Sequence, residues 1–235
     1  MDLEIKSVAY WGPRKEGVVQ CTRRFLRYME AIAELGPPLA RWHEKAYTRK
    51  EALMRRLDID RASLRRLLDE GRNRSEMDGS VIRDLGFYVD IWNGAREDRA
   101  VSLSALCGKY SEYAGPNHVF LRYFSRYWLD RWLDAEVAVA LVRAAVDAWE
   151  PDWAGMCARQ ATRKAIDRGE FDPMVPFVDW VLYHRRKRRR KLPAPARVVF
   201  EMHGGECILI KDTPVDPDDP DDRAHVRAVA RALGL

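Results

Sequence analysis

The chain has 235 residues, enough for one large domain or two small ones with a substantial core. Hydrophobic residues make up 47% of the sequence, which excludes a disordered protein. The most apolar stretch, Val137–Val146, is too short to span a bilayer, and the acidic first residues are unlike a signal peptide. We therefore expect a cytoplasmic protein that does not contact a membrane.

The net charge of +5 comes from one segment of the chain. Arg185 to Lys191 is a run of seven consecutive basic residues, and without this basic run the chain is slightly acidic. A general nucleic-acid-binding surface is therefore less favoured than the isoelectric point suggests. Three interpretations of the run stay open: a solvated hairpin loop between Phe177–His184 and Val198–Met202, a loop that contacts phosphate, or a docking surface for an acidic protein.

The first segment predicts a strand that leads into a helix. Leu3–Arg14 contains the β-branched and aromatic side chains that are typical of a half-buried strand, and Gly12-Pro13 ends it. Apolar residues then recur at helical spacing from Glu16 onward until the Gly36-Pro37-Pro38 segment ends the helix. A second, short helix is predicted over Leu39–Tyr47.

Two further helices are predicted from their N-caps. Thr48 precedes Arg49–Leu57, and Glu51 at the third position completes a capping box. Asp60 is expected to cap a helix over Arg61–Gly71 in the same way. The first part of the chain is therefore expected to be one strand with several short amphipathic helices.

The middle of the chain changes from helical to strand periodicity. Gly86–Trp92 alternates in the manner of a strand with two different faces, and Ala100–Cys107 and Val119–Phe124 follow after short connections. Three such neighbours predict an antiparallel meander. Asp130–Trp149 then has little polar face and is expected to be a buried central helix that lies across the sheet.

The last part of the chain predicts more strands and a closing helix. The expected elements are a strand or extended link at Trp153–Cys157, an alternating stretch at Phe177–His184, a hairpin of Val198–Met202 and Cys207–Ile210 around Gly204-Gly205, and a helix at Arg223–Leu233. No internal repeat or linker is visible. We predict one α+β domain over residues 1–235, with a mostly antiparallel sheet and helices packed on it.

The sequence contains no recognisable catalytic or metal-binding motif. The phosphate-binding glycine loops, the nucleophile elbow and the paired-histidine zinc motif are all absent. The acidic loop Asp216–Asp222 lacks the residue order of a calcium loop, and Glu201–Lys211 lacks the acid-x-Lys order of a restriction-type nuclease. The four cysteines are far apart and are expected to be small buried side chains. We therefore expect no catalytic residue, metal or cofactor.

Large aromatic side chains near strand ends, together with neighbouring acids, are candidates for binding a protein partner. Aromatic residues that are exposed often become the buried anchors of an interface, and acidic residues beside them can meet a basic partner. The candidate partner-binding residues are Trp11, Tyr88, Asp90, Trp92, Glu97 and Asp98.

Five segments spread over nearly the whole chain share features with a family of bacterial proteins. They are the opening motif Tyr10-Trp11-Gly12-Pro13-Arg14-Lys15-Glu16, the Arg41-Trp42 pair, Arg49-Lys50-Glu51-Ala52-Leu53, Trp92-Asn93-Gly94, and His203-Gly204-Gly205 with Lys211-Asp212 beyond it. With these segments the sequence resembles the immunity protein 52 family. The opening motif is the most specific of them.

The resemblance implies the cognate immunity protein of a polymorphic toxin system, made beside an effector often delivered by type VI secretion. The toxin in such pairs is typically a restriction-endonuclease-like nuclease. The protein would bind the toxin in the producing cell and block its access to DNA, with no enzymatic activity of its own. Steric occlusion by a shaped surface of mixed charge is the mechanism we expect.

Two other functions stay open on the residues alone. The chain could bind nucleic acid through Arg185–Lys191, in which case binding would weaken steeply with salt. It could also be a metal-dependent nuclease, which magnesium-stimulated cleavage by the pure protein would reveal.

Overall fold

The computed structural model describes residues 4–111, 115–169, 171–186, 188 and 190–235. The strands in this part of the chain are β1 (Ile5–Trp11), β2 (Trp42–Glu44), β3 (Arg56–Leu57), β4 (Phe87–Trp92), β5 (Ser102–Cys107), β6 (Asn117–Phe124), β7 (Trp153–Ala158), β8 (Val181–His184), β9 (Arg197–Met202) and β10 (Gly205–Leu209). The α-helices are α1 (Val18–Ala33), α2 (Arg49–Met54), α3 (Arg61–Glu70), α4 (Arg126–Leu129), α5 (Ala135–Trp149), α6 (Arg159–Asp167) and α7 (Pro220–Leu233), and the 3-10 helices are η1 (Pro37–Leu39), η2 (Arg83–Leu85) and η3 (Glu97–Arg99). Among these helices, none has both the length and the apolar character that crossing a membrane requires.

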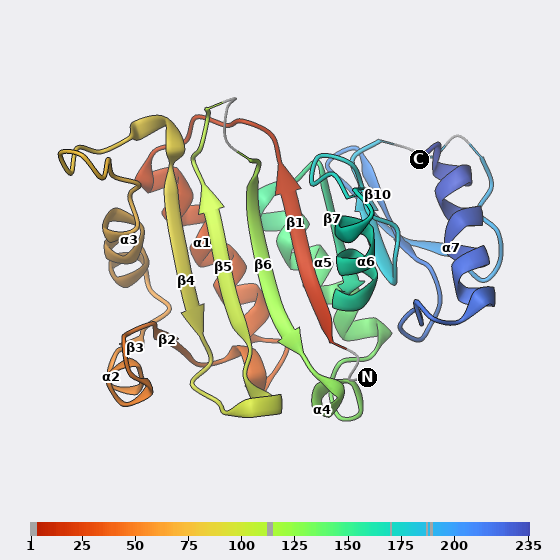
Figure 1. Cartoon of the computed structure of the whole chain (residues 1–235), viewed down its shortest axis with the longest axis horizontal. Coiled ribbons are helices and arrows are strands. Elements are labelled where there is room, and N and C mark those ends of the chain that lie inside the picture. The colour runs from red at the N-terminus through yellow and green to blue at the C-terminus, as the bar shows by residue number, and fades with distance from the viewer. Residues whose placement is uncertain (1–3, 112–114, 170, 187, 189) are drawn as a thin grey trace.

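All these strands join one sheet in the order β3-β2-β4-β5-β6-β1-β7-β8-β10-β9 (Figure 1). Every pair of neighbours is antiparallel. The strand predicted at the start of the sequence, β1, lies in the middle and pairs with β6 and β7. The predicted meander is confirmed as β4, β5 and β6. The chain therefore has the α+β fold that the sequence predicts.

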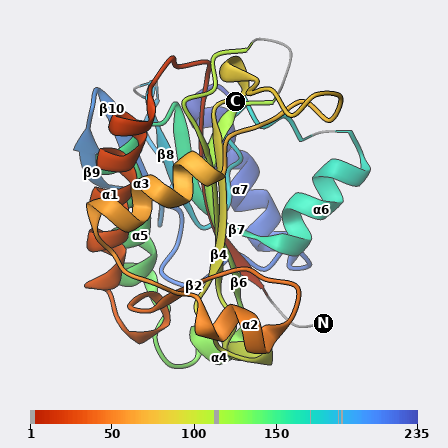
Figure 2. The ribbon, with the colours of Figure 1, turned by 90° about the vertical axis from the view of Figure 1, so that its left-hand side faces the viewer.

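Helices cover the two faces of the sheet unevenly. Figure 2 shows α1, α3 and α5 on one side of the sheet and α6 and α7 on the other. Alternate residues of β1 separate the two sides, because successive side chains of a strand point to opposite faces. Ile5, Ala9 and Trp11 belong to the larger core with α1 and α5, whereas Val8 and Tyr10 belong to a smaller core with α7.

The predicted buried helix is α5, although it begins later than expected. Asp134 caps it by accepting a hydrogen bond of 2.9 Å from the backbone N–H of Val137, and residues Arg126–Leu129 form the separate helix α4. Of the 15 residues of α5, eight are buried, and most of these are Ala, Val or Leu. A helix with so little polar surface is stable only between other layers, here α1 and the sheet.

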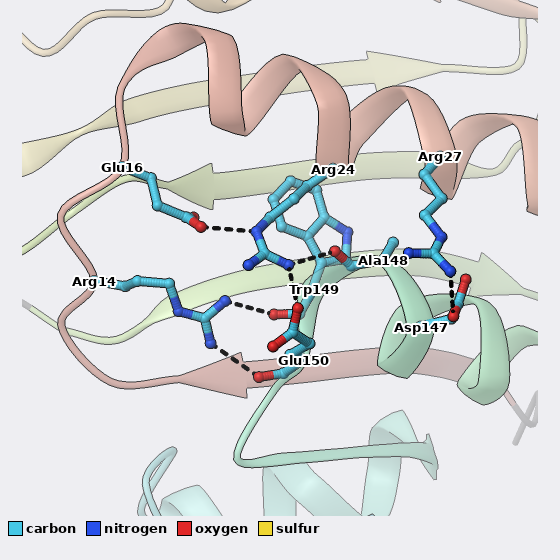
Figure 3. Close-up of polar contacts among 8 residues, drawn as sticks. All are labelled: Arg14, Glu16, Arg24, Arg27, Asp147, Ala148, Trp149 and Glu150. Carbon is cyan, nitrogen blue, oxygen red and sulfur yellow. Dashed lines mark hydrogen bonds and ion pairs between the residues drawn. The ribbon is translucent and has the colours of Figure 1, made fainter. Parts of the chain in front are cut away.

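Two arginines bind the C-terminal end of α5 (Figure 3). The Arg14 guanidinium donates hydrogen bonds of 2.7 and 2.9 Å to the carbonyl oxygens of Trp149 and Glu150. Arg24 of α1 donates to the carbonyl oxygen of Ala148 at 2.9 Å and to the Glu150 carboxylate at 3.0 Å. The last carbonyls of a helix have no partner within it, and cations are favoured there by the helix dipole. The two side chains therefore fix α5 to β1 and α1.

The capped helices are confirmed close to their predicted starts. Thr48 and Glu51 form the reciprocal bonds of a capping box at α2, and Asp60 accepts from the backbone N–H of Ser63 at 2.9 Å to begin α3. The hairpin of β9 and β10 is also confirmed. Its turn residues, His203 and Gly204, have φ angles of +48° and +78°, as a two-residue hairpin turn of type I′ requires.

The helix predicted over Leu39–Tyr47 is wrong. Trp42–Glu44 forms strand β2, which pairs with β3 and β4. The Trp42 side chain is fully buried and its Nε1–H donates to the carbonyl oxygen of Leu39 at 2.9 Å. Burial of this large ring fixes an extended segment at the sheet edge, which outweighs the weak helical pattern. The helix expected to reach Leu57 likewise ends at Met54, before β3.

The basic run does not form a hairpin loop, because β10 lies between β8 and β9 in the sheet. It instead connects two strands that are not neighbours. Among its described residues, Arg188 lies 2.6 Å from the Glu206 carboxylate and Arg185 lies 3.6 Å from that of Asp152. Lys187 and Arg189 fall outside the described residues.

Candidate partner-binding surface

One half of the sheet has a face that no helix of the described chain covers. In Figure 1, α6 and α7 lie in front of the β7 to β9 half, while the front of β4, β5 and β6 is bare. We call this surface the open face. Its side chains are Tyr88, Asp90 and Trp92 of β4, Ser102, Ser104 and Leu106 of β5, and His118, Phe120 and Arg122 of β6.

The strand register arranges these residues in rows across the sheet. Tyr88 lies opposite Leu106, which lies opposite His118. The next row is Asp90, Ser104 and Phe120, and the last is Trp92, Ser102 and Arg122. Each row therefore combines side chains from three separate segments of the chain, and the open face exists only once the meander has formed.

Aromatic rings form the centre of the open face. The rings of His118 and Phe120 are stacked with centroids 4.2 Å apart, and Tyr10 of β1 meets Phe120 edge-on at 5.2 Å. The Arg122 guanidinium lies over the Phe120 ring, 4.8 Å from its centroid. Burial lowers the pKa of His118 to about 4, so this imidazole is neutral at pH 7. The cluster is thus a largely uncharged aromatic surface with one cation at its edge.

The open face is unlike the solvated face of an ordinary antiparallel sheet, which is polar. Tyr88 is 42% exposed, and Trp92, Leu106 and Phe120 are half-buried. Ser104 is only 2% exposed, yet its hydroxyl has no hydrogen-bond partner, and the same holds for the indole N–H of Trp92. The open face therefore presents large aromatic and apolar side chains where a solvated sheet face would be polar, which is typical of an interaction surface.

Two hollows border the open face. One, of about 500 Å³, lies between β1, β6 and α6 and includes Phe120 and Arg122 of the open face. The other, of about 310 Å³, lies beside α2 and includes Trp92 and Ser102. Together they extend the aromatic surface into shapes that could receive side chains of a partner.

Charged side chains lie along the β4 edge of the open face. Asp90 pairs with Lys45 at 2.5 Å, and the Arg49 guanidinium lies 5.8 Å from the ring centroid of Trp92. Burial and the neighbouring Asp90 carboxylate raise the pKa of Tyr88 above its ordinary value, so its hydroxyl is protonated and able to donate a hydrogen bond at pH 7. This edge offers both signs of charge to a partner.

The structure brings three of the six predicted partner-binding residues together. Tyr88, Asp90 and Trp92 share the open face. Glu97 and Asp98 are exposed in η3, just after β4, where the hydroxyl of Ser125 donates to the carbonyl oxygen of Asp98. They therefore lie at the end of the sheet beside α4 and not on the face itself.

The prediction for Trp11 needs correction. Its side chain is 1% exposed and points to the opposite side of the sheet, into the larger core. There it stacks on Trp149 with ring centroids 5.2 Å apart. Because a partner cannot reach this ring without unfolding the core, Trp11 stabilises the fold and is not a surface anchor.

The sequence reasoning missed the contribution of β6. His118, Phe120 and Arg122 occupy the positions of that strand that an exposed sheet face would fill with small polar residues. Apolar residues at both alternating sets of positions were the available signal, since Val119 and Leu121 are buried on the covered face and Phe120 lies between them. Strands that are apolar on both sides are typical of sheets that are covered on both faces.

The described residues contain no cluster of three or more His, Cys, Asp or Glu side chains that could hold a metal ion. The open face combines aromatic rings with a cation at its edge, and these are side chains that are enriched at protein interfaces.

Comparison with known proteins identifies the family. The family model described as immunity protein 52 matches residues 5–232. Among solved structures, the Pseudomonas aeruginosa T6SS protein PA0821 is similar, with a TM-score of 0.55 and 16% sequence identity over 99% of this chain and 72% of that one. At this identity the likeness concerns the fold alone. A comparison with curated proteins found no significant match. Since the family model matches nearly the whole chain, this protein belongs to the immunity protein 52 family.

Proposed function

We propose that this protein binds a cognate toxin through the open face and neutralises it without catalysing a reaction. The observation that carries the proposal is the aromatic surface of β4, β5 and β6, which no helix of the described chain covers, whereas α1, α3 and α5 lie on the opposite side of the sheet. Membership of an immunity protein family supplies the kind of partner.

The toxin in this proposal is a nuclease effector of the restriction-endonuclease-like class, from a polymorphic toxin or type VI secretion system. The resemblance noted in the sequence supports the nuclease class, and the description of the structurally similar protein PA0821 as a T6SS protein supports only the secretion system. The protein would act by covering the active site of the toxin. A rigid sheet suits this role, because little entropy is lost when a preformed surface binds.

The expected interface is of standard size, roughly 800 Å² on each partner. Binding energy in such interfaces is concentrated in a few aromatic and arginine side chains near the centre. On the open face these are Tyr88, Trp92 and Arg122. Asp90, with Glu97 and Asp98 at the end of the sheet, would influence the association rate more than the affinity.

The test is co-expression with the effector encoded by the neighbouring gene. The wild-type protein should restore growth of a host that makes the toxin domain, and the pure proteins should form a complex. Tyr88→Ala combined with Trp92→Ala should abolish both effects while the variant stays folded. Val19→Ala is the matched control, because Val19 is 50% exposed on α1, on the other side of the sheet. Protection by the double variant at the wild-type level would exclude the open face.

A further inference from the structure

The hollow between β1, β6 and α6 contains cations that lack a carboxylate partner. It is lined by four basic side chains, Lys6, Arg122, Arg159 and Arg163, and by two acidic ones. The acids are already engaged, since Glu4 lies 2.5 Å from Arg159 and Asp167 lies 3.8 Å from Arg163. Neither Lys6 nor Arg122 forms an ion pair with any described carboxylate.

The surroundings of these two cations are aromatic. The Lys6 ammonium lies 6.0 Å from the ring centroid of Phe171, and the Arg122 guanidinium covers the Phe120 ring. Burial is the main cause that lowers the pKa of Lys6; Arg122 and Arg159 add to this effect, whereas Cys157 and Asp179 oppose it. Among the described residues, the Asp179 carboxylate forms no ion pair with Lys6. A charge removed from water in this way is destabilised until an anion pairs with it.

The hollow is continuous with the open face, because Phe120 and Arg122 belong to both. A protein bound on the open face would therefore be able to extend a side chain into it. The rings of Tyr10 and Phe120 provide an apolar wall for the methylene groups of such a side chain, and the two cations provide its charge partner.

We propose that this hollow receives the carboxylate of an acidic side chain of the cognate toxin, held between Lys6 and Arg122. This inference rests on the proposed function and specifies the chemistry at one end of the interface. It makes Lys6 and Arg122 specificity-determining residues, since a toxin with an apolar or basic residue at that position would leave the two cations buried and unpaired.

The test compares Lys6→Met and Arg122→Met with Arg163→Met. The last is the matched control, because it removes the same charge from the same hollow but from a side chain that has its own carboxylate partner. Affinity is measured with the toxin domain of the neighbouring gene, and the melting temperature is measured on the free proteins. We expect Lys6→Met and Arg122→Met to weaken binding by at least about tenfold and the control by less than about threefold. Lys6→Met should melt at or above the wild-type temperature, because it removes a partly buried charge that has no carboxylate partner. A lower melting temperature would mean that Lys6 stabilises the fold.

Charge reversal identifies the partner group. Lys6→Glu should abolish binding, and replacing one acidic residue of the toxin with Lys should restore it. Titration with inorganic phosphate tests whether the hollow binds small anions instead of a toxin side chain. If phosphate binds in the hollow and Lys6→Met removes that binding but leaves the toxin affinity unchanged, the hollow is a site for small anions and the inference is wrong. Equal toxin affinities for all three methionine variants also overturn it, although the proposed function then stands. If the wild-type protein does not bind the toxin, both proposals fail.

Discussion

The two faces of strands β4, β5 and β6 are built from alternate residues of the same segments, yet they differ in how completely the rest of the chain buries them. On the covered face, Val89, Ile91 and Leu103 are at most 2% exposed and pack under helices. On the open face, Tyr88 is exposed and Ser104 and Trp92 carry unpartnered polar atoms. The covered face is packed under the protein's own helices, and on the open face no helix of the described chain covers these strands. Substitutions on the two faces should therefore act on different quantities, stability on one and affinity on the other.

The largest effect is expected on the covered face. Leu103→Ala should lower the free energy of unfolding by about 2–5 kcal/mol, because it removes a fully buried side chain and leaves a cavity. Chemical denaturation of the free protein measures this. The fraction that remains folded should bind the toxin with wild-type affinity, and a loss of affinity in the folded protein would contradict the division between the faces.

The second effect concerns the open face. Trp92→Ala should weaken toxin binding by about 2 kcal/mol or more, as hot-spot aromatics do. Its free energy of unfolding should change much less than that of Leu103→Ala, since the ring is only half-buried in the free protein. Calorimetric titration and denaturation of the same variant separate the two quantities. A large stability loss with unchanged affinity would make Trp92 a core residue.

Arg14, one of the two arginines that bind the end of α5 (Figure 3), provides a second stability test on the covered side of the sheet. Arg14→Ala should cost about 1–3 kcal/mol of stability, because it leaves the carbonyl oxygens of Trp149 and Glu150 without their donor. Arg27→Ala is the control, since the Arg27 side chain is 60% exposed in its pair with Asp147 and should cost about 0.5 kcal/mol or less. Equal losses of stability for the two variants would show that the Arg14 hydrogen bonds contribute no more than a surface ion pair.

The pH dependence of stability should report on His118 of the open face. Burial lowers its pKa from 6.5 to about 4 in the folded protein, so the unfolded chain binds this proton more readily. Above pH 6.5 His118 is neutral in both states and does not change the free energy of unfolding. As the pH falls from 6.5 towards 4, the unfolded chain takes up this proton first, so the free energy of unfolding decreases. Denaturation between pH 7 and pH 4 should show a smaller decrease for His118→Phe than for the wild-type protein. Parallel curves would mean that His118 is solvated.

The smallest effect is expected at the basic run. Replacing Arg190 and Lys191, both exposed, with Gln should change toxin affinity by less than about 0.5 kcal/mol. The basic run connects β8 and β9, which lie near the opposite end of the sheet from β4. Binding of labelled duplex DNA at low salt is the companion measurement. Tight DNA binding that these substitutions remove would favour the nucleic-acid alternative instead.

Local signals made much of the fold predictable. The N-caps Thr48 and Asp60, the Gly-containing hairpin turn and the alternation of Gly86–Trp92 each depend on residues close in sequence, and each is confirmed. Strand β2 was missed because three residues carry no reliable pattern, and only the long-range burial of Trp42 makes them extended. Element types are thus decided locally, whereas edge strands are decided by the sheet they join.

The candidate site was only partly predictable for a related reason. The alternation of β4 placed Tyr88, Asp90 and Trp92 on one face, but which face stays bare depends on where α6 and α7 pack. Trp11 was misassigned because an aromatic residue at a strand end looks the same in sequence whether it is covered or exposed. Lys6 and Arg122 meet in one hollow because β1 and β6 pair with Ser7 opposite Leu121, a long-range register that no local pattern contains.

The central place of β1 determines how late in synthesis this molecule can act. Its partners β6 and β7 are made long after it, and Tyr10 pairs with residues as distant in sequence as His118 and Trp153. A nascent chain that ends before β7 holds its first strand with one neighbour at most, and contacts of such long range form slowly. Assembly of the sheet therefore depends on translation running nearly to completion, and truncated products of this gene should not form the open face.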